Sequence, residues 1–130
     1  MSDMGKAIII PCSEELPEVI LDKEKNEFKI NGRSLPENSF EFYRPLITWM
    51  DEYVTNPNPV THVHVFLEYL NSSSVKQVFF LLTKLEVLVK NGKEAKIIWY
   101  YQPGDELMKT KGMEFKKLLN VPFEMKENQK

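Results

Sequence analysis

The chain has 130 residues, of which 42% are hydrophobic and 28% charged, and its formal net charge is −2. This balance is typical of one folded domain and argues against a disordered chain. Arginine occurs only at Arg33 and Arg44, and without a basic excess we expect no nucleic-acid partner.

No apolar run is long enough to cross a bilayer or to form the core of a signal peptide. The single cysteine, Cys12, cannot form an intrachain disulfide, which fits a reducing compartment. We therefore expect a cytoplasmic protein with no membrane partner, folded as one domain over residues 1–130. Residues 1–5 and 125–130 are expected to be disordered tails.

The first predicted elements are a hairpin and a helix. Two short apolar stretches, at residues 19–21 and 27–30, flank a polar turn, which is typical of a β-hairpin. From residue 38 to residue 54 apolar side chains recur at helical spacing, and Asn38 with Glu41 resembles a capping box. Pro45 lacks the backbone N–H and would clash with the carbonyl of Glu41. We therefore expect a broken first turn, with the regular helix beginning near Arg44.

The second half of the chain alternates between strand and helix patterns. The predicted elements are a strand at 61–70, a helix at 74–90, a strand at 95–101 and a helix at 105–119 that is weakened at Gly112. Strand, helix, strand is a βαβ unit, whose strands are parallel and joined by a right-handed crossover. The predicted fold is therefore α/β: a mixed sheet with an N-terminal hairpin, a βαβ unit and about three helices packed on the sheet, similar in layout to the STAS fold.

The junction between the first of these strands and its helix carries three consecutive hydroxyls. Ser72, Ser73 and Ser74 stand where the helix begins, beside backbone N–H groups that have no partner within the helix. A phosphoryl group there would meet those donors and the positive end of the helix dipole. The turn is therefore a candidate phosphoacceptor. Serine and asparagine are also favoured as ordinary helix caps, and both interpretations stay open.

The βαβ topology predicts further neighbours for this turn. The carboxyl ends of parallel strands lie on one edge of the sheet, which is the usual place for binding in open α/β sheets. If the two strands are neighbours, one partner-binding surface is expected around the serines. Its members would be Asn71, Ser73, Lys76, Tyr101 and Asp105.

Other chemistries have weaker support. His62 and His64 share one face of the predicted strand, about 6.6 Å apart, but no third metal ligand is indicated. No glycine-rich phosphate loop and no Gly-x-Ser-x-Gly turn occurs, and Cys12 lacks a recognisable base. We expect no cofactor and no catalysis, with a metal-dependent enzyme using His62 and His64 left as an alternative.

Four segments, met in order along residues 6–124, resemble the SiaC-like family of bacterial regulatory phosphoproteins. These segments are residues 32–37 (Gly-Arg-Ser-Leu-Pro-Glu), 42–49 (Phe-Tyr-Arg-Pro-Leu and then Trp49), 68–76 (Glu-Tyr-Leu-Asn-Ser-Ser-Ser-Val-Lys) and 99–112 (Trp-Tyr-Tyr, then Asp105, Glu106 and Gly112). The resemblance implies a partner-switching protein, similar in logic to the anti-sigma-factor antagonists. A serine/threonine kinase would phosphorylate it and a PP2C-type phosphatase would reverse this. Phosphorylation would decide whether it binds its effector, in the best understood systems a diguanylate cyclase that sets cyclic di-GMP levels and biofilm behaviour.

The sequence departs from the family at the acceptor position. The family pattern is Asn-Thr-Ser-Ser, with the threonine as acceptor, and Ser72 stands at the matching position. Serine has the same nucleophilic oxygen, so the resemblance implies that Ser72 is phosphorylated. Phosphate at Ser73 or Ser74 instead would mean that the alignment of this chain with the family pattern is shifted by one or two residues. The remaining alternative is a constitutive adaptor in which Ser72 only caps the helix.

Overall fold

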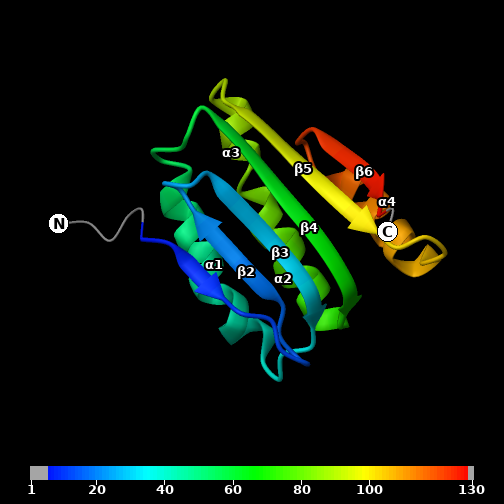
Figure 1. Ribbon diagram of the computed structural model, residues 1–130. Coiled ribbons are helices and arrows are strands. Elements are labelled where there is room, and N and C mark those ends of the chain that lie inside the picture. The colour runs from blue at the N-terminus through cyan, green and yellow to red at the C-terminus, as the bar shows by residue number, and fades with distance from the viewer. Residues whose placement is uncertain (1–5, 129–130) are drawn as a thin grey trace.

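The computed structural model describes residues 6–128 and contains a six-stranded mixed sheet whose strands lie side by side in chain order (Figure 1). The strands are β1 (Ile8–Ile10), β2 (Glu18–Asp22), β3 (Glu27–Ser34), β4 (Val60–Leu70), β5 (Glu94–Tyr101) and β6 (Phe123–Glu127). The helices are α1 (Ser39–Tyr53), α2 (Ser72–Thr83), α3 (Glu86–Lys90) and α4 (Glu106–Leu118). Strands β1 to β3 pair antiparallel, whereas β3 to β6 pair parallel.

The helices all lie on one face of the sheet. Each parallel connection, from β3 to β6, passes through helix, and the strand order never reverses. Right-handed crossovers in one direction place every helix on the same side, and Figure 1 shows the helices behind the sheet. The core fills the space between these two layers, and its largest fully buried side chains include Trp99, Tyr43, Tyr53, Phe28 and Met50.

The predicted α/β fold is confirmed in its main elements. The hairpin forms with Val19 opposite Ile30, and its turn is held where the Asp22 carboxylate accepts from the Lys25 N–H at 3.1 Å. The predicted βαβ unit also forms, with β4 and β5 as parallel neighbours. Because β3 also pairs parallel with β4, the hairpin and the βαβ unit belong to one sheet.

Two edge strands extend the predicted sheet. Strand β1 pairs with β2, and β6 pairs with β5. The expected C-terminal tail is therefore wrong for residues 125–127, which are part of β6. Of the other expected tail residues, 1–5 and 129–130 lie outside the described residues, and Asn128 donates its backbone N–H to the carbonyl of Tyr101 at 2.8 Å.

Helix α1 does not begin at Arg44 as expected. It runs from Ser39 to Tyr53 with Pro45 inside it, and its cap Asn38 accepts from the Glu41 N–H at 3.1 Å. The first turn is closed by a bond from the Phe42 N–H to the Asn38 carbonyl at 3.0 Å. The burial of Tyr43 anchors this turn to the core and holds it in register despite the proline.

The predicted helix at 74–90 is two helices. It begins two residues earlier, at Ser72, and breaks after Thr83, where Lys84 and Leu85 donate to carbonyls three residues back. The tighter turn shifts the helical phase. Leu88 is therefore fully buried, whereas Val89 is 38% exposed.

Gly112 does not weaken α4, which continues through it. The glycine lies against the indole of Trp99, and a Cβ there would overlap that ring. The residue is therefore explained by the close approach of α4 to β5.

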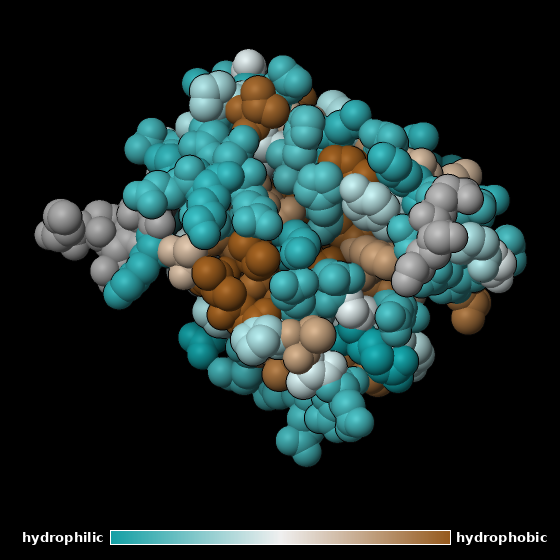
Figure 2. Space-filling model, viewed as in Figure 1, coloured by the Kyte–Doolittle hydropathy of each residue, from teal (hydrophilic) through white to brown (hydrophobic). Residues whose placement is uncertain are grey.

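Within residues 6–128, the other face of the sheet carries no helix. Seen from that side, hydrophobic residues gather over β1 and β2 within a largely hydrophilic surface (Figure 2), where Ile9 pairs with Ile20. Among residues 6–128, no helix is both long enough and apolar enough to span a membrane.

Candidate functional site

Two helices begin side by side at the edge where β3 and β4 end (Figure 1). The strand ends are joined by a bond from the Asn71 N–H to the Ser34 carbonyl at 3.1 Å. Each helix has an asparagine cap: Asn38 caps α1, and the Asn71 Oδ1 accepts from the Ser74 N–H of α2 at 2.9 Å. Because α1 and α2 also pack against each other, their first turns form one continuous surface.

A chain of five hydroxyls runs inward from this surface, from the exposed Ser73 to the buried Tyr43. Successive oxygens are 2.7 Å apart for Tyr43 and Ser34, 2.9 Å for Ser34 and Ser74, 3.0 Å for Ser74 and Ser39, and 2.8 Å for Ser39 and Ser73. Burial raises the pKa of Tyr43 to about 12, opposed by its hydrogen bond to Ser34. These bonds tie the first turns of α1 and α2 to the end of β3.

The three consecutive serines have different environments. Ser74 is fully buried and bonded to Ser34 and Ser39. Ser73 is exposed, but its hydroxyl is bonded to Ser39 and donates to the Asn71 Oδ1 at 3.3 Å. Ser72 is exposed and its hydroxyl makes no hydrogen bond to any residue in the described range 6–128. Only Ser72 is therefore both accessible and unengaged.

Ser72 faces a hollow of about 440 Å³ between the two helix starts. The residues that line the hollow are Glu37, Asn38, Ser39, Phe40, Ser72, Ser73, Lys76 and Gln77. Lys76 lies one helical turn after Ser72 and thus on the same side of α2. Within residues 6–128 its ammonium group has no ion-pair partner, so the hollow combines one unpaired cation with the carboxylate of Glu37.

The structure brings together some of the residues predicted to surround the serines. Ser73 and Lys76 line the hollow, and Asn71 caps the helix that forms it. Tyr101 and Asp105 are at the same edge of the sheet but do not line the hollow. The ammonium of Lys109 lies 5.8 Å from the Tyr101 ring, and Asp105 caps α4 by accepting from the Met108 N–H at 3.1 Å.

The second wall of the hollow comes instead from the start of α1, residues 37–40. Sequence reasoning identified Asn38 as a cap but did not connect it with Ser72. Only the pairing of β3 with β4 places the two helix starts together. The polar residues at 37–39, at the start of a helix, are the sequence feature that could have indicated this second wall.

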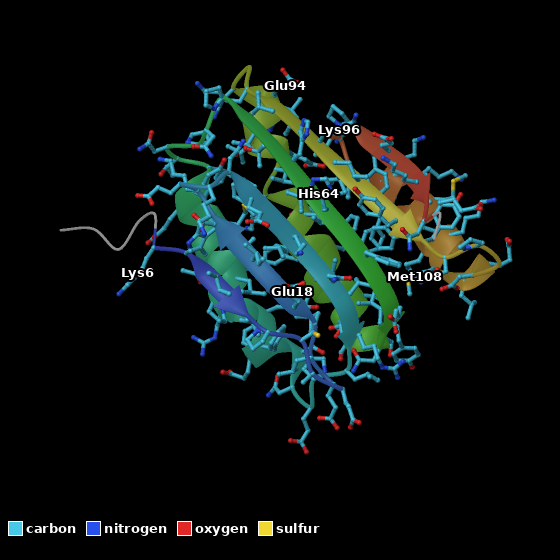
Figure 3. All side chains as sticks on the ribbon, in the orientation of Figure 1. Lys6, Glu18, His64, Glu94, Lys96 and Met108 are labelled. Atoms are coloured by element: carbon cyan, nitrogen blue, oxygen red, sulfur yellow. The ribbon has the colours of Figure 1, made fainter. Side chains whose placement is uncertain are left out.

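His62 and His64 lie away from this site, and His64 is midway along β4 on the helix-free face (Figure 3). The His64 Nδ1 is 2.9 Å from the Tyr100 hydroxyl. Partial burial lowers the pKa of His64, as do the nearby His62, Lys126 and Lys29. Among the described residues, no group of three or more His, Cys, Asp or Glu side chains is arranged to hold a metal ion.

A model of the family described as SiaC family regulatory phosphoprotein matches residues 10–128. The chain belongs to the SiaC family. An uncharacterized protein of Pseudomonas aeruginosa strain UCBPP-PA14 is 28% identical over 123 residues, which cover 95% of this chain and 94% of the relative.

Solved structures of SiaC family proteins share this fold. The chain matches the crystal structure of the diguanylate cyclase SiaD in complex with its activator SiaC, from P. aeruginosa, with a TM-score of 0.86 and 26% identity over 93% of this chain and 99% of that chain. It matches SiaC of P. aeruginosa with a TM-score of 0.84 and 24% identity over 94% and 98% of the two chains.

Membership of the SiaC family makes this chain a regulatory phosphoprotein. The predicted resemblance is thereby confirmed. The geometry of the Ser72 hollow bears on which residue accepts the phosphoryl group and on what the chain binds.

Proposed function

We propose that Ser72 is the phosphoacceptor of this SiaC family protein, and that its phosphorylation controls binding to an effector protein, a diguanylate cyclase. In this proposal the chain is cytoplasmic and has no catalytic activity of its own. The observation that supports Ser72 is its hydroxyl, which is exposed at the start of α2 and has no hydrogen bond to any of residues 6–128, whereas Ser73 is hydrogen-bonded and Ser74 is buried. The proposed cyclase partner follows the relative that activates SiaD.

The modification cycle needs two enzymes. A serine/threonine kinase transfers the γ-phosphoryl group of ATP to the Ser72 Oγ, so an O–P bond forms, the β–γ bridging bond breaks and ADP leaves. The hydroxyl proton passes to a base of the kinase. A PP2C-type phosphatase then hydrolyses the phosphoester with one water, which restores the hydroxyl and releases inorganic phosphate.

Phosphorylation would act on binding through charge and hydration. The phosphoryl group adds about 1.5 to 2 negative charges at pH 7. On the free protein this charge meets solvent, the N–H groups at the start of α2 and the unpaired Lys76. A partner that covers Ser72 closely would have to desolvate the dianion, at a cost of several kcal/mol. A loss of about 4 kcal/mol weakens affinity roughly a thousandfold.

Mass spectrometry after incubation with the cognate kinase and ATP tests the acceptor. We expect one phosphate on the wild-type protein, mapped to Ser72, and none on Ser72→Ala. Ser73→Ala is the matched control, because its hydroxyl is also exposed, and it should still be phosphorylated. Phosphate on Ser72→Ala would contradict the assignment.

Titration calorimetry tests the control of binding. The partner is the purified cognate diguanylate cyclase, defined as the cyclase encoded nearest to the gene of this protein. Unmodified wild-type protein should bind it, and both the phosphorylated protein and Ser72→Asp should bind far more weakly. Equal binding by all three would indicate a constitutive adaptor.

A further inference from the structure

We propose that the effector docks in a groove between α1 and α2 that begins at Ser72 and is anchored on Phe40 and Phe80. This inference rests on the proposed function, because it names the surface through which phosphorylation would act. The occupant is a segment of the cyclase that presents apolar side chains to the groove and a carboxylate to Lys76.

The hollow at Ser72 continues into a second one. This second hollow, of about 240 Å³, is lined by Phe40, Arg44, Ile47, Thr48, Gln77 and Phe80. Phe40 and Gln77 also line the hollow at Ser72, so the two form one groove along the seam between α1 and α2, called here the α1–α2 groove. A partner that fills this groove reaches Ser72 without any change in the fold.

Two exposed aromatic rings mark the α1–α2 groove. Phe40 is 59% exposed and Phe80 is 48% exposed, although each extends from a helix that is otherwise packed on the sheet. Large aromatic side chains at such positions are typical anchors of protein interfaces, where their burial supplies much of the affinity. The Lys84 ammonium lies 4.2 Å from the Phe80 ring centroid and 3.1 Å from the Asp51 carboxylate, so the Phe80 end of the groove is tied to both helices.

The hollow at Ser72 presents the ammonium group of Lys76 beside the carboxylate of Glu37. Arg44 is 3.0 Å from the Glu41 carboxylate, whereas Lys76 has no ion-pair partner in the described part of the chain. A carboxylate of the partner can therefore pair with Lys76. A phosphoryl group on Ser72, one turn away on the same helix, would take that lysine and repel the carboxylate.

A second group of exposed apolar side chains lies outside the α1–α2 groove. Leu107, Met113 and Leu118 are on α4, which lines neither hollow. A partner bound on α4 alone would leave the hollow at Ser72 unfilled. The α1–α2 groove is thus favoured as the surface that Ser72 controls.

Alanine variants of the anchors test the groove. Binding of the purified cognate cyclase is measured by calorimetry for Phe40→Ala and Phe80→Ala, with Leu107→Ala as the matched control because Leu107 is more exposed than either. We expect each phenylalanine variant to bind at least tenfold more weakly than wild type, and Leu107→Ala to bind within twofold. The thermal midpoint should be unchanged in all three, and Phe80→Ala, whose position lies outside the Ser72 hollow, should be phosphorylated by the kinase like wild type.

The outcomes separate the two proposals. If wild type binds the cyclase and Ser72→Asp does not, but both phenylalanine variants bind like wild type, the groove is overturned and the proposed function stands. If wild type does not bind the cyclase at all, both are overturned. If the phenylalanine substitutions convert a dimer of this chain into a monomer in size-exclusion chromatography, a second copy is the occupant and the groove proposal is overturned.

Photo-crosslinking keeps the test informative if an alanine variant folds poorly. Benzoylphenylalanine replaces Gln77, which lines both hollows, and Leu107 in a control protein. We expect a crosslink to the cyclase from position 77, lost on phosphorylation of Ser72, and none from position 107. Crosslinking from position 107 alone would overturn the proposal.

Discussion

The Tyr43 hydroxyl ends the buried chain of hydroxyls that joins β3 to the starts of α1 and α2. It is fully buried and 2.7 Å from the Ser34 oxygen. From the sequence, Tyr43 is one aromatic residue on the apolar face of a helix. Its polar role could not be predicted, because Ser34 and Ser74 become its neighbours only when the sheet forms.

The raised pKa of Tyr43, about 12 against an ordinary value of 10.0, predicts a loss of stability at high pH. Between these two values the unfolded state releases the phenol proton and the folded state retains it. The stabilisation is thus complete below pH 10 and falls as the pH rises towards 12, by roughly 2–3 kcal/mol in total. Urea unfolding of wild type at pH 9 and pH 11.5 measures the loss.

Tyr43→Phe is the control for this prediction. It should lose less stability over the same pH interval, because it lacks the phenol hydroxyl whose pKa differs between the folded and unfolded states. At pH 9 it should be about 1 kcal/mol less stable, since the bond to Ser34 is gone. Parallel pH profiles for the two proteins would contradict the prediction.

The three consecutive serines, residues 72–74, show how much of the site the local sequence predicts. Their position at a helix start follows from the strand before them and the apolar spacing after them. Which of the three hydroxyls is already bonded depends in part on Ser39, since this residue of α1 bonds to Ser73 and Ser74 and not to Ser72. No local pattern contains that information.

At the scale of elements, hydrophobic periodicity predicted the hairpin, the βαβ unit and the principal helices. It failed where a contact outside the element decides the conformation. The break between α2 and α3 contains no glycine or proline, only Lys84 and Leu85, of which Leu85 is fully buried in the core. Strands β1 and β6 have only three and five residues. They are held by pairing with β2 and β5.

Pro45 provides the test at this scale. Inside a continuous α1 it leaves the Glu41 carbonyl without its usual donor, so Pro45→Ala should restore one helical hydrogen bond and remove a clash. We expect stabilisation by roughly 1–3 kcal/mol, measured by urea unfolding. If α1 began only at Arg44, the proline would lie in the first turn, where it is tolerated, and the substitution would give no gain.

At the scale of the whole molecule, the order of the strands decides which residues meet. The sequence predicted that Ser72, Tyr101 and Asp105 reach one edge of the sheet, because parallel strands end together. It could not show that β3 flanks β4 on the other side and brings the start of α1 to Ser72. That pairing joins residues about 35 positions apart, so the α1 wall of the hollow appears only in the assembled sheet.

The exposed position of Ser72 at the edge of this sheet predicts that phosphorylation changes the surface and leaves the fold intact. A charge on exposed Ser72 stays hydrated at a helix start, which stabilises it by roughly 0.3–1 kcal/mol. Ser72→Asp should therefore unfold within about 1 kcal/mol of wild type in a thermal melt, although it binds the cyclase poorly.

Ser74→Asp is the contrasting variant, because its side chain is fully buried among the hydroxyls of Ser34 and Ser39. Placing a carboxylate there costs several kcal/mol, so this protein should melt far earlier or fail to fold. Hydrogen exchange should locate any change in Ser72→Asp within the first turns of α1 and α2. A Ser72→Asp protein that melts as early as Ser74→Asp would mean that the charge disrupts the hydroxyl cluster, and that modification acts by unfolding instead of by excluding a partner.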